Sequence, residues 1–332
     1  ESWGVVSNPV DCPAIYPNYH LCANFKLYEK VLDHLLPNFP TSPLNQISTK
    51  KFDKTTRLPL EVSRSILYAI ISLYLRAGFY GRVNDINIES ILLDMKDEFA
   101  LFEAQSSELA VISLVRLKEE EKEPFWLNIY HIMLLHALVY MKHRPFPEHR
   151  DLMKFYKKIV YKIDGLEFNL YEVLVGMLRG GFTKDDSLGQ ALSYSPTNPK
   201  SKFACKERDD YISLLISFGT TTSPVICMYN LEDFVQQRTL AINQYLRTQC
   251  APIAATKTLY VPQPLKLFAK DFKGEKVMQK ELLKMFKLEE GGWSVKWQPV
   301  DIECGIYLEH LNEEGITVIH RNVPYFAQYK MF

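Results

Sequence analysis

The spacing of apolar residues divides the chain into stretches with the period of a helix and shorter runs typical of strands. Helical spacing predicts three helices in the first part of the chain, at residues 60–77, 88–102 and 107–117. The stretch 123–143 is apolar nearly all round, as expected of a helix enclosed by the rest of the domain. The charged run 118–123 before it is typical of a solvated turn. We therefore expect a helical core built around one buried central helix.

Two strand-like runs, residues 159–163 and 166–170, flank the pair Asp164-Gly165. This pair predicts a β-hairpin, because both turn residues must accept a positive φ. Further strands are predicted at 211–218, 259–261, 294–298 and 316–321, and further helices at 150–157, 171–179, 231–248 and 277–288. Helices and strands mix without regular βαβ alternation. We predict an α+β fold: a predominantly helical domain with a β-hairpin and a small mixed or antiparallel sheet.

The length of the chain allows more than one structural part. Its 332 residues, 47% of them hydrophobic, can bury a substantial core. The first 49 residues are rich in Pro, Asn and Cys around one short helical pattern at 25–36, so we interpret residues 1–55 as an N-terminal strap. We assign residues 56–272 to a core domain and residues 273–332 to a C-terminal extension of helix and strands packed on that core.

The charge and hydropathy of the chain disfavour some classes of partner. Lys and Arg together number 39, as do Asp and Glu, so no net charge attracts nucleic acid or an anionic membrane. The longest apolar stretch in the middle of the chain, residues 125–141, is interrupted by polar residues and falls short of the roughly 20 that cross a bilayer. We expect no nucleic-acid partner and no membrane span.

The six cysteines are dispersed and show neither a CxxC pair nor the Cys/His spacing typical of zinc. We therefore expect no metal and no cofactor. Cys12 and Cys22 could form a local disulfide in a secreted protein, whereas so few cysteines in a chain of this length also suit the reducing cytosol. We favour a cytoplasmic location.

A turn rich in hydroxyl groups is the first candidate site. It reads ISFGTTTSP, in which Thr220, Thr221, Thr222 and Ser223 follow a glycine. Successive backbone N–H groups here could bind a small anion or a nucleotide, with Arg179 nearby. The turn lacks the second glycine and the lysine of a P-loop, and no Gly-x-Ser-x-Gly surrounds Ser223. Hydroxyl groups in turns usually bond their own backbone, so we interpret this turn mainly as a structural feature.

The predicted central helix carries three polar residues in apolar surroundings, namely Asn128, His131 and His136. Asn128 and Tyr130 on this helix are candidate binding residues. A helix advances about 100° per residue, so the two histidines point about 140° apart and cannot form the pair that an i, i+4 metal site requires. Asn128 and His131 are neighbours on one face. Buried Asn and His side chains are more often satisfied by backbone groups than engaged in chemistry. We therefore expect structural roles for them.

Four segments, taken in order, carry a resemblance to a known family. They are ELAVISLVRLKEEEKEPFWLNIYHIMLLHA from residue 108, IDGLEFNLYEVLVGMLR from 163, DDYISLLISFGTTTSPVICMYN from 209 and LYVPQPLKLFAKDF from 259. The first contains an aromatic-Trp-x-Asn-x-Tyr motif at Trp126, Asn128 and Tyr130, followed by His136 on the same apolar helix. The set resembles the family catalogued as domain of unknown function 547, in its eukaryotic form, over residues 88–272. The resemblance implies a mixed helical and β domain, often found beside other modules in larger eukaryotic proteins, with no assigned activity.

The chain departs from the bacterial form of that family, whose histidine, asparagines and cysteines could hold thiol or general-base chemistry. The resemblance places Ser213 at the histidine, Ser217 at the asparagine, and Phe218 and Ser223 at the two cysteines. His131 stands at the second asparagine of the central motif, and Cys227 stands where an arginine commonly follows the Ser-Pro turn. Replacing a thiol with a hydroxyl that has no local base removes most of its reactivity. The departures imply a degenerate or repurposed member.

Three hypotheses for function follow. The first is a non-catalytic protein-interaction or scaffold domain, with other proteins as partners. The second is a serine- or cysteine-dependent hydrolase or acyl-transfer enzyme, with Ser223 or Cys227 as nucleophile, His136 or His131 as base, and the backbone of residues 220–222 as oxyanion site. The third is small-anion or nucleotide binding at the same turn with Arg179. The surroundings of the Ser223 hydroxyl and of the two imidazoles distinguish them.

Overall fold

A computed structural model describes residues 39–77, 88–141, 155–180, 197–207, 209–219, 223–298, 310–312 and 315–317. The chain divides into two compact units, residues 1–39 and residues 40–332, and the elements below belong to the second. The short helix expected at 25–36 and the cysteines at 12 and 22 lie outside the described residues.

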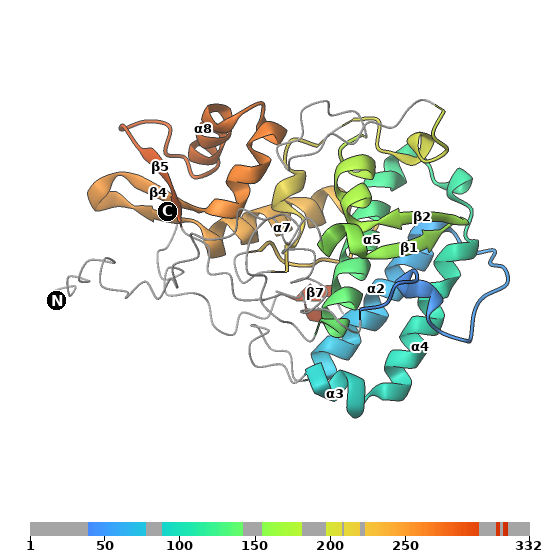
Figure 1. The fold of residues 1–332 in the computed structure, drawn as a ribbon. Helices are drawn as coiled ribbons and strands as arrows, with labels where there is room; N and C mark the ends of the chain where they lie inside the picture. The colour runs from blue at the N-terminus through green and yellow to red at the C-terminus, as the bar shows by residue number, and fades with distance from the viewer. Residues whose placement is uncertain are drawn as a thin grey trace, which may run out of the picture. The chain divides into compact units, whose positions relative to one another are not determined.

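The helical core is formed by α2 (Pro59–Arg76), α3 (Ile88–Leu93), α4 (Lys96–Ser106) and α5 (Glu119–Tyr140) (Figure 1). Every residue of α5 from Pro124 to Val139 is buried, so it is the enclosed central helix that the sequence predicts. Helix α2 packs along α5, and its buried Tyr74 hydroxyl donates to the Leu135 carbonyl over 2.9 Å. Pro59 occupies the first turn of α2, where its missing N–H has no helical partner to lose.

Helix α5 begins four residues before the predicted start, so the interpretation of residues 118–123 as a solvated turn is wrong. These residues form the first turn of the helix, in which the Glu121 carboxylate accepts a 2.8 Å hydrogen bond from the Lys118 N–H. Three consecutive glutamates, starting at Glu119, complement the positive end of the helix dipole. Charge in this run therefore stabilises the start of a helix rather than a loop.

Two other helix predictions are corrected. The single helix expected at 88–102 is broken into α3 and α4 at Asp94 and Met95, a break that no glycine or proline marks. The helix expected at 107–117 is replaced by two 3-10 turns, η4 (Ser107–Val111) and η5 (Leu114–Arg116). Here the reason is plain: the Leu109 and Ala110 carbonyls accept 3.0 Å hydrogen bonds from the hairpin turn instead of from a helix of their own.

The β-hairpin is confirmed. Strands β1 (Val160–Ile163) and β2 (Leu166–Asn169) pair antiparallel, with Ile163 opposite Leu166. The turn residues Asp164 and Gly165 have φ values of 49° and 73°, the left-handed conformation that the hairpin turn requires. The chain then enters η6 (Glu172–Met177), a π-helical segment where an ordinary helix was expected at 171–179.

The strand predicted at 211–218 is absent. The segment forms one 3-10 turn, η8 (Ile212–Leu214), and then runs through the core without a strand partner. Its residues from Ile212 to Phe218 are all buried. The apolar run therefore reflects burial on all sides, which periodicity cannot distinguish from a buried strand.

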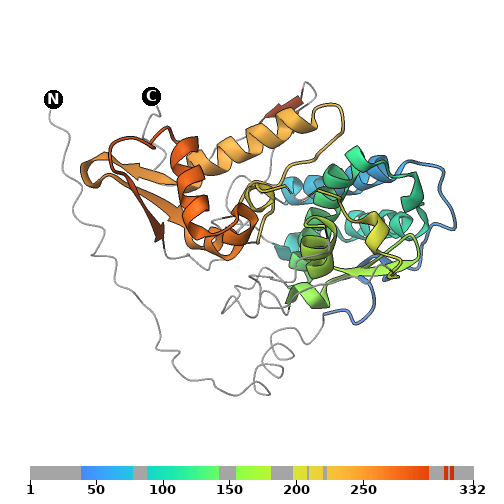
Figure 2. The same ribbon diagram turned by 90° about the horizontal axis from the view of Figure 1, so that it is seen from above.

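The helix predicted at 231–248 is present as α7 (Phe234–Gln249). A small sheet and further helical elements follow it. A three-stranded sheet has the order β3 (Ala251–Ile253), β4 (Thr258–Pro262), β5 (Ser294–Gln298), antiparallel and then parallel. The connection from β4 to β5 contains η10 (Gln263–Phe272) and α8 (Glu275–Met285), and these elements are drawn in orange in Figures 1 and 2. A short hairpin is formed by β6 (His310–Asn312) and β7 (Gly315–Thr317), and the rest of the strand expected at 316–321 lies outside the described residues.

A second hydrophobic cluster holds the C-terminal elements together. Its fully buried members include Tyr245 of α7, Leu259 of β4, and Met278 and Leu282 of α8. With the sheet and the hairpin, the molecule has the α+β composition that the sequence predicts. Among the described residues, no helix combines the length and the apolar character needed to span a membrane.

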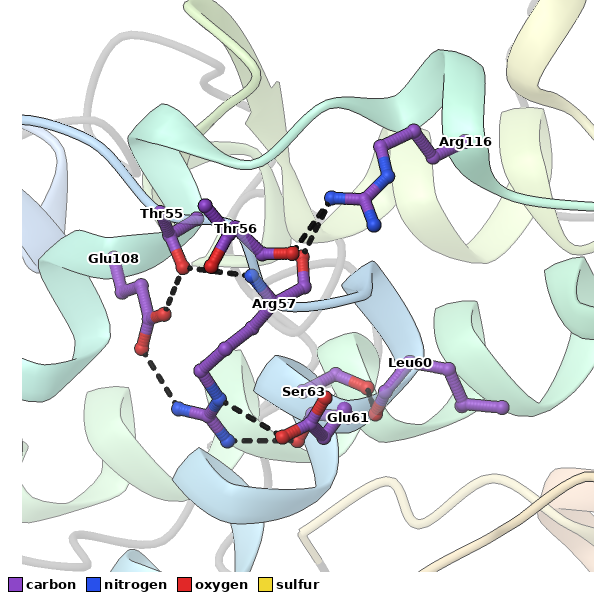
Figure 3. Close-up of polar contacts among 8 residues, drawn as sticks. All are labelled: Thr55, Thr56, Arg57, Leu60, Glu61, Ser63, Glu108 and Arg116. Carbon is purple, nitrogen blue, oxygen red and sulfur yellow. Dashed lines mark hydrogen bonds and ion pairs between the residues drawn. The ribbon is translucent and has the colours of Figure 1, made fainter.

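The segment that leads into α2 is fixed to the core by a partly buried charge network, shown in Figure 3. The Glu108 carboxylate is buried and accepts hydrogen bonds from the Thr55 hydroxyl at 2.6 Å and from Arg57 at 3.0 Å. Arg57 also donates to Glu61 on the first turn of α2, and Arg116 donates to the Thr56 carbonyl. Glu108 thereby joins η4 to the residues just before α2.

We expect Arg57→Gln to lower the free energy of unfolding by about 2 kcal/mol, because it leaves the buried Glu108 carboxylate with one donor fewer. Urea denaturation followed by circular dichroism measures the change. The matched control is Arg76→Gln, which breaks the solvent-exposed Arg76–Glu98 pair on α2 and α4. Equal losses for the two variants would show that burial of Glu108 does not matter.

Candidate functional site

Several polar side chains of α5 bond backbone groups of an irregular part of the chain, the described residues between 202 and 229. Lys122, Trp126 and Tyr130 are spaced four residues apart and therefore lie along one side of the helix. The Lys122 ammonium donates to the Lys202 and Ala204 carbonyls, each over 3.0 Å. The Trp126 indole N–H donates to the Phe203 carbonyl over 2.9 Å. Both side chains thus satisfy backbone oxygens of one short stretch.

Asn128 bonds both backbone groups of one residue. Its amide nitrogen donates to the Tyr229 carbonyl and its amide oxygen accepts from the Tyr229 N–H, each over 2.9 Å. Asn128 is fully buried, and the two bonds replace those that a neighbouring strand would give. The side chain that the sequence offers as a polar candidate is therefore occupied by backbone.

Tyr130 holds the segment ahead of the hydroxyl-rich turn. Its hydroxyl donates to the Ser217 carbonyl over 2.8 Å and lies 3.0 Å from the Tyr156 hydroxyl. Burial raises the pKa of Tyr130 well above its ordinary value. The phenol is therefore neutral at physiological pH and serves as a hydrogen-bonding group, not as a base.

His131 is oriented by the neighbouring amide. Its Nε2 accepts a hydrogen bond from the Ser217 N–H over 3.4 Å, so the neutral ring carries its proton on Nδ1. Complete burial lowers the pKa of His131 to about 3. No described residue bonds Nδ1. A neutral imidazole has one lone pair available for a proton, and here the Ser217 N–H occupies it.

His136 contacts a different part of the core. Its Nδ1 lies 2.7 Å from the Tyr161 hydroxyl on β1, and its Nε2 lies 3.6 Å from the Glu103 carboxylate on α4. Burial is the largest effect on His136 and lowers its pKa, against the opposing effect of Glu103. His136 thus faces α4 and β1 while His131 faces Ser217, as the spacing of five residues on a helix requires.

Ser223 is closed off by the same segment. Its side chain is 1% exposed, and its Oγ accepts a 3.0 Å hydrogen bond from the Phe218 N–H. Gly219 between them has a φ of 75°, and a Cβ there would meet the Leu138 side chain of α5 at 3.5 Å. Thr220, Thr221 and Thr222 lie outside the described residues. The bond across the turn fixes the backbone on either side of them.

Cys227, the alternative nucleophile, is also buried, with 4% of its surface exposed. Its Sγ lies 3.9 Å from the carbonyl of Val225, two residues earlier in the chain. A structural buried thiol of this kind is much less accessible to a substrate than a thiol in an open, electropositive site.

Arg179 is committed to a buried ion pair. Its guanidinium donates three hydrogen bonds to the Asp271 carboxylate, at 2.9, 3.0 and 3.1 Å, and a fourth to the Leu174 carbonyl at 2.7 Å. The plane of the guanidinium also lies over the Phe268 ring, which stacks on Phe218. Asp271 neutralises the charge that the anion-binding hypothesis assigns to Arg179. This pairing over 92 residues has no local sequence signal.

Two carboxyl groups, one of them on α5, lie close to each other and to an arginine of α7. Glu123 of α5 lies beside Asp209, and Arg238 of α7 makes a bidentate pair with Asp209. Burial, followed by the charge of Asp209, raises the pKa of Glu123 from 4.5 to about 7. Neither carboxyl was a candidate from sequence, because their proximity depends on the path of the segment around residue 209.

Among the described residues, no group of three or more His, Cys, Asp or Glu side chains could hold a metal ion. The polar groups of α5 therefore do not add up to a metal centre within the part of the chain that the structure covers. Five of them bond backbone groups of described residues between 202 and 229, namely Lys122, Trp126, Asn128, Tyr130 and His131. His136 instead contacts Tyr161 and Glu103.

Comparison with protein families identifies one similarity. The model of the family described as "Protein of unknown function, DUF547" matches residues 114–246. The matched range includes α5, the hairpin and the segment 209–230, and it is shorter than the range of 88–272 that the motifs indicate. No curated protein and no solved structure matches the chain. The chain thus resembles this family over the part that contains the candidate site.

We expect Asn128→Ala to destabilise the fold by about 3 kcal/mol, because it leaves the Tyr229 N–H and carbonyl buried without their partner. Chemical denaturation gives the difference. The matched control is Asn243→Ala at an exposed position of α7, where a change within about 0.5 kcal/mol is expected. A loss at position 128 no larger than the control would mean that water replaces these two bonds without penalty.

The raised pKa of Glu123 predicts a pH dependence of stability. Between its ordinary pKa of 4.5 and about 7, the folded state holds a proton that the unfolded state has released. The contribution of the protonated Glu123 to the free energy of unfolding is therefore fully present below pH 4.5 and is lost as the pH rises to about 7. Glu123→Gln, which is permanently neutral, should gain stability relative to wild type over this interval.

The measurement is the difference in free energy of unfolding between Glu123→Gln and wild type at a series of pH values, which cancels the titration of all other groups. Glu120→Gln, at an exposed position of the same helical turn, is the control and should give a flat difference. A flat difference for Glu123→Gln as well would contradict the shift.

Proposed function

We propose that the chain is a non-catalytic protein-interaction or scaffold domain, a degenerate form of the family that it resembles. The proposal rests mainly on one observation: the lone pair of His131 Nε2 already accepts a hydrogen bond from the Ser217 N–H. With Nε2 bonded to the Ser217 N–H and the proton on Nδ1, the imidazole closest in sequence to the motif has no site to receive a proton from a nucleophile.

The other polar landmarks support the same proposal. Asn128, Trp126 and Tyr130 bond backbone groups of the core, and the Ser223 hydroxyl bonds the Phe218 N–H. His136 faces Tyr161 and Glu103 rather than the Ser-Pro turn. A motif whose members hold the fold can persist without any reaction to perform, because loss of any one of these bonds destabilises the core.

The two rival functions gain less support from these contacts. A hydrolase needs a nucleophile that a substrate can reach and a base that can accept its proton, and Ser223 and Cys227 are both buried. Anion binding at the turn needs a free cation, and Arg179 is paired with Asp271. Other proteins are therefore the partners that we propose. The three described cysteines, Cys205, Cys227 and Cys250, are buried thiols, which favours a reducing compartment such as the cytoplasm.

The test is labelling of the folded protein with a fluorophosphonate probe for active serines and with iodoacetamide for thiols. We expect no adduct on Ser223 or Cys227 in the native protein, and alkylation of Cys227 only after unfolding. Ser223→Ala serves as the background control for the serine probe. A native adduct on Ser223 that disappears in His131→Phe, with the fold of that variant verified by circular dichroism, would establish an enzyme and overturn the proposal.

A further inference from the structure

Exposed lysines follow one another along α8, the helix labelled in Figure 1. Lys276, Lys280, Lys284 and Lys287 follow one another at intervals of four, four and three residues, and all four are exposed. Lys276, Lys280 and Lys284 belong to α8, where these intervals keep their side chains within a sector of about 80° and spread them over about 12 Å along the axis. Lys287 lies two residues beyond the end of the helix. We call these four residues the lysine ridge.

The opposite side of α8 is fixed in the hydrophobic cluster of the C-terminal elements. Met278 and Leu282 are fully buried there against β4 and η10. A helix held in this way cannot turn its apolar side towards another surface. The lysine ridge is therefore presented outwards as a set of charges, and its contacts with any partner are electrostatic.

Residues 275–290 contain four lysines and four glutamates, but the two glutamates of α8, Glu275 and Glu281, lie outside the sector of its lysines. Lys276, Lys280 and Lys287 form no ion pair with any described residue, and the Lys284 Nζ lies 4.0 Å from Glu281 at the limit of a pair. Residues 251–298 contain nine lysines and five carboxylates, a net charge of +4 in a chain whose total is zero. One of those carboxylates, Asp271, is already neutralised by Arg179. The positive excess belongs to residues 251–298 as a whole, and on α8 itself the positive charge is gathered on its lysine face.

We propose that the lysine ridge docks the protein on a membrane surface rich in anionic lipid headgroups. A plane of diffuse negative charge attracts a row of outward lysines additively, and no shaped pocket is needed. Residues 251–298 contain no arginine, whereas nucleic-acid and phosphopeptide sites rely on the planar guanidinium for bidentate contacts. The exposed Val277 beside the ridge adds a small apolar contact. Binding of this kind is peripheral and weakens as salt rises.

The experiment is co-sedimentation of the full chain with vesicles of phosphatidylcholine alone or mixed with phosphatidylserine. We expect binding only to the vesicles that contain phosphatidylserine, and release by added NaCl. The variant Lys276→Gln/Lys280→Gln/Lys284→Gln should bind these vesicles on the order of 100-fold more weakly. The matched control is Lys50→Gln/Lys51→Gln/Lys54→Gln, which removes three exposed lysines from the segment before α2 and should bind as wild type does.

Each other outcome contradicts the proposal. Equal losses in the two triple variants would show that total charge matters and the ridge does not. No binding to either vesicle would exclude an anionic membrane as partner. Tighter binding to a duplex DNA or single-stranded RNA oligonucleotide than to the vesicles, at the same salt, would assign the ridge to nucleic acid.

Folding of the ridge variant is checked by its melting temperature. The variant Lys276→Arg/Lys280→Arg/Lys284→Arg keeps the charge and should keep vesicle binding, so a loss there would also count against an electrostatic surface. None of these results depends on whether Ser223 is reactive, so the docking proposal and the scaffold proposal fail separately.

Discussion

The fold depends on satisfying the backbone of a segment that crosses the core without regular structure. A buried N–H or carbonyl without a partner destabilises a protein as much as a lost hydrogen bond. Residues 212–218 and Tyr229 are buried, and none of them belongs to a described strand. Helix α5 supplies the partners from its side chains, with Asn128 acting towards Tyr229 as a neighbouring strand would.

This use of side chains limits the chemistry that they can perform. A hydrogen bond to a backbone group keeps a side chain in one orientation and one protonation state. The Ser217 N–H selects the tautomer of His131, and burial keeps that ring neutral. The Tyr161 hydroxyl lies against one nitrogen of His136 in the same manner. Polar residues on a buried helix are thus not in themselves a sign of catalysis, because the surrounding backbone can account for them.

How much of this can be predicted from sequence depends on how far apart the interacting residues are. The Asp164-Gly165 turn was predictable because its determinant is the conformation of two adjacent residues. The helix at 107–117 was wrongly predicted because its carbonyls bond a hairpin turn some 55 residues away. The false strand at 211–218 has a related origin, since the N–H and carbonyl of Ser217 bond His131 and Tyr130 on α5, about 86 residues away. At the candidate site, the 140° separation of the two histidines could be predicted, whereas the partner of Arg179 could not.

The pairing of Arg179 with Asp271 also connects the core to the surface proposed for docking. Asp271 lies at the end of η10, and α8 begins four residues later at Glu275. Bringing both charges out of water is unfavourable unless their hydrogen bonds are well formed, and the three bonds between them meet that condition. The pair therefore fixes the end of η10 against η6, and with it the point from which α8 starts. Because Met278 and Leu282 then fix the rotation of α8, the direction of its lysines is set by the same buried contacts that hold the core.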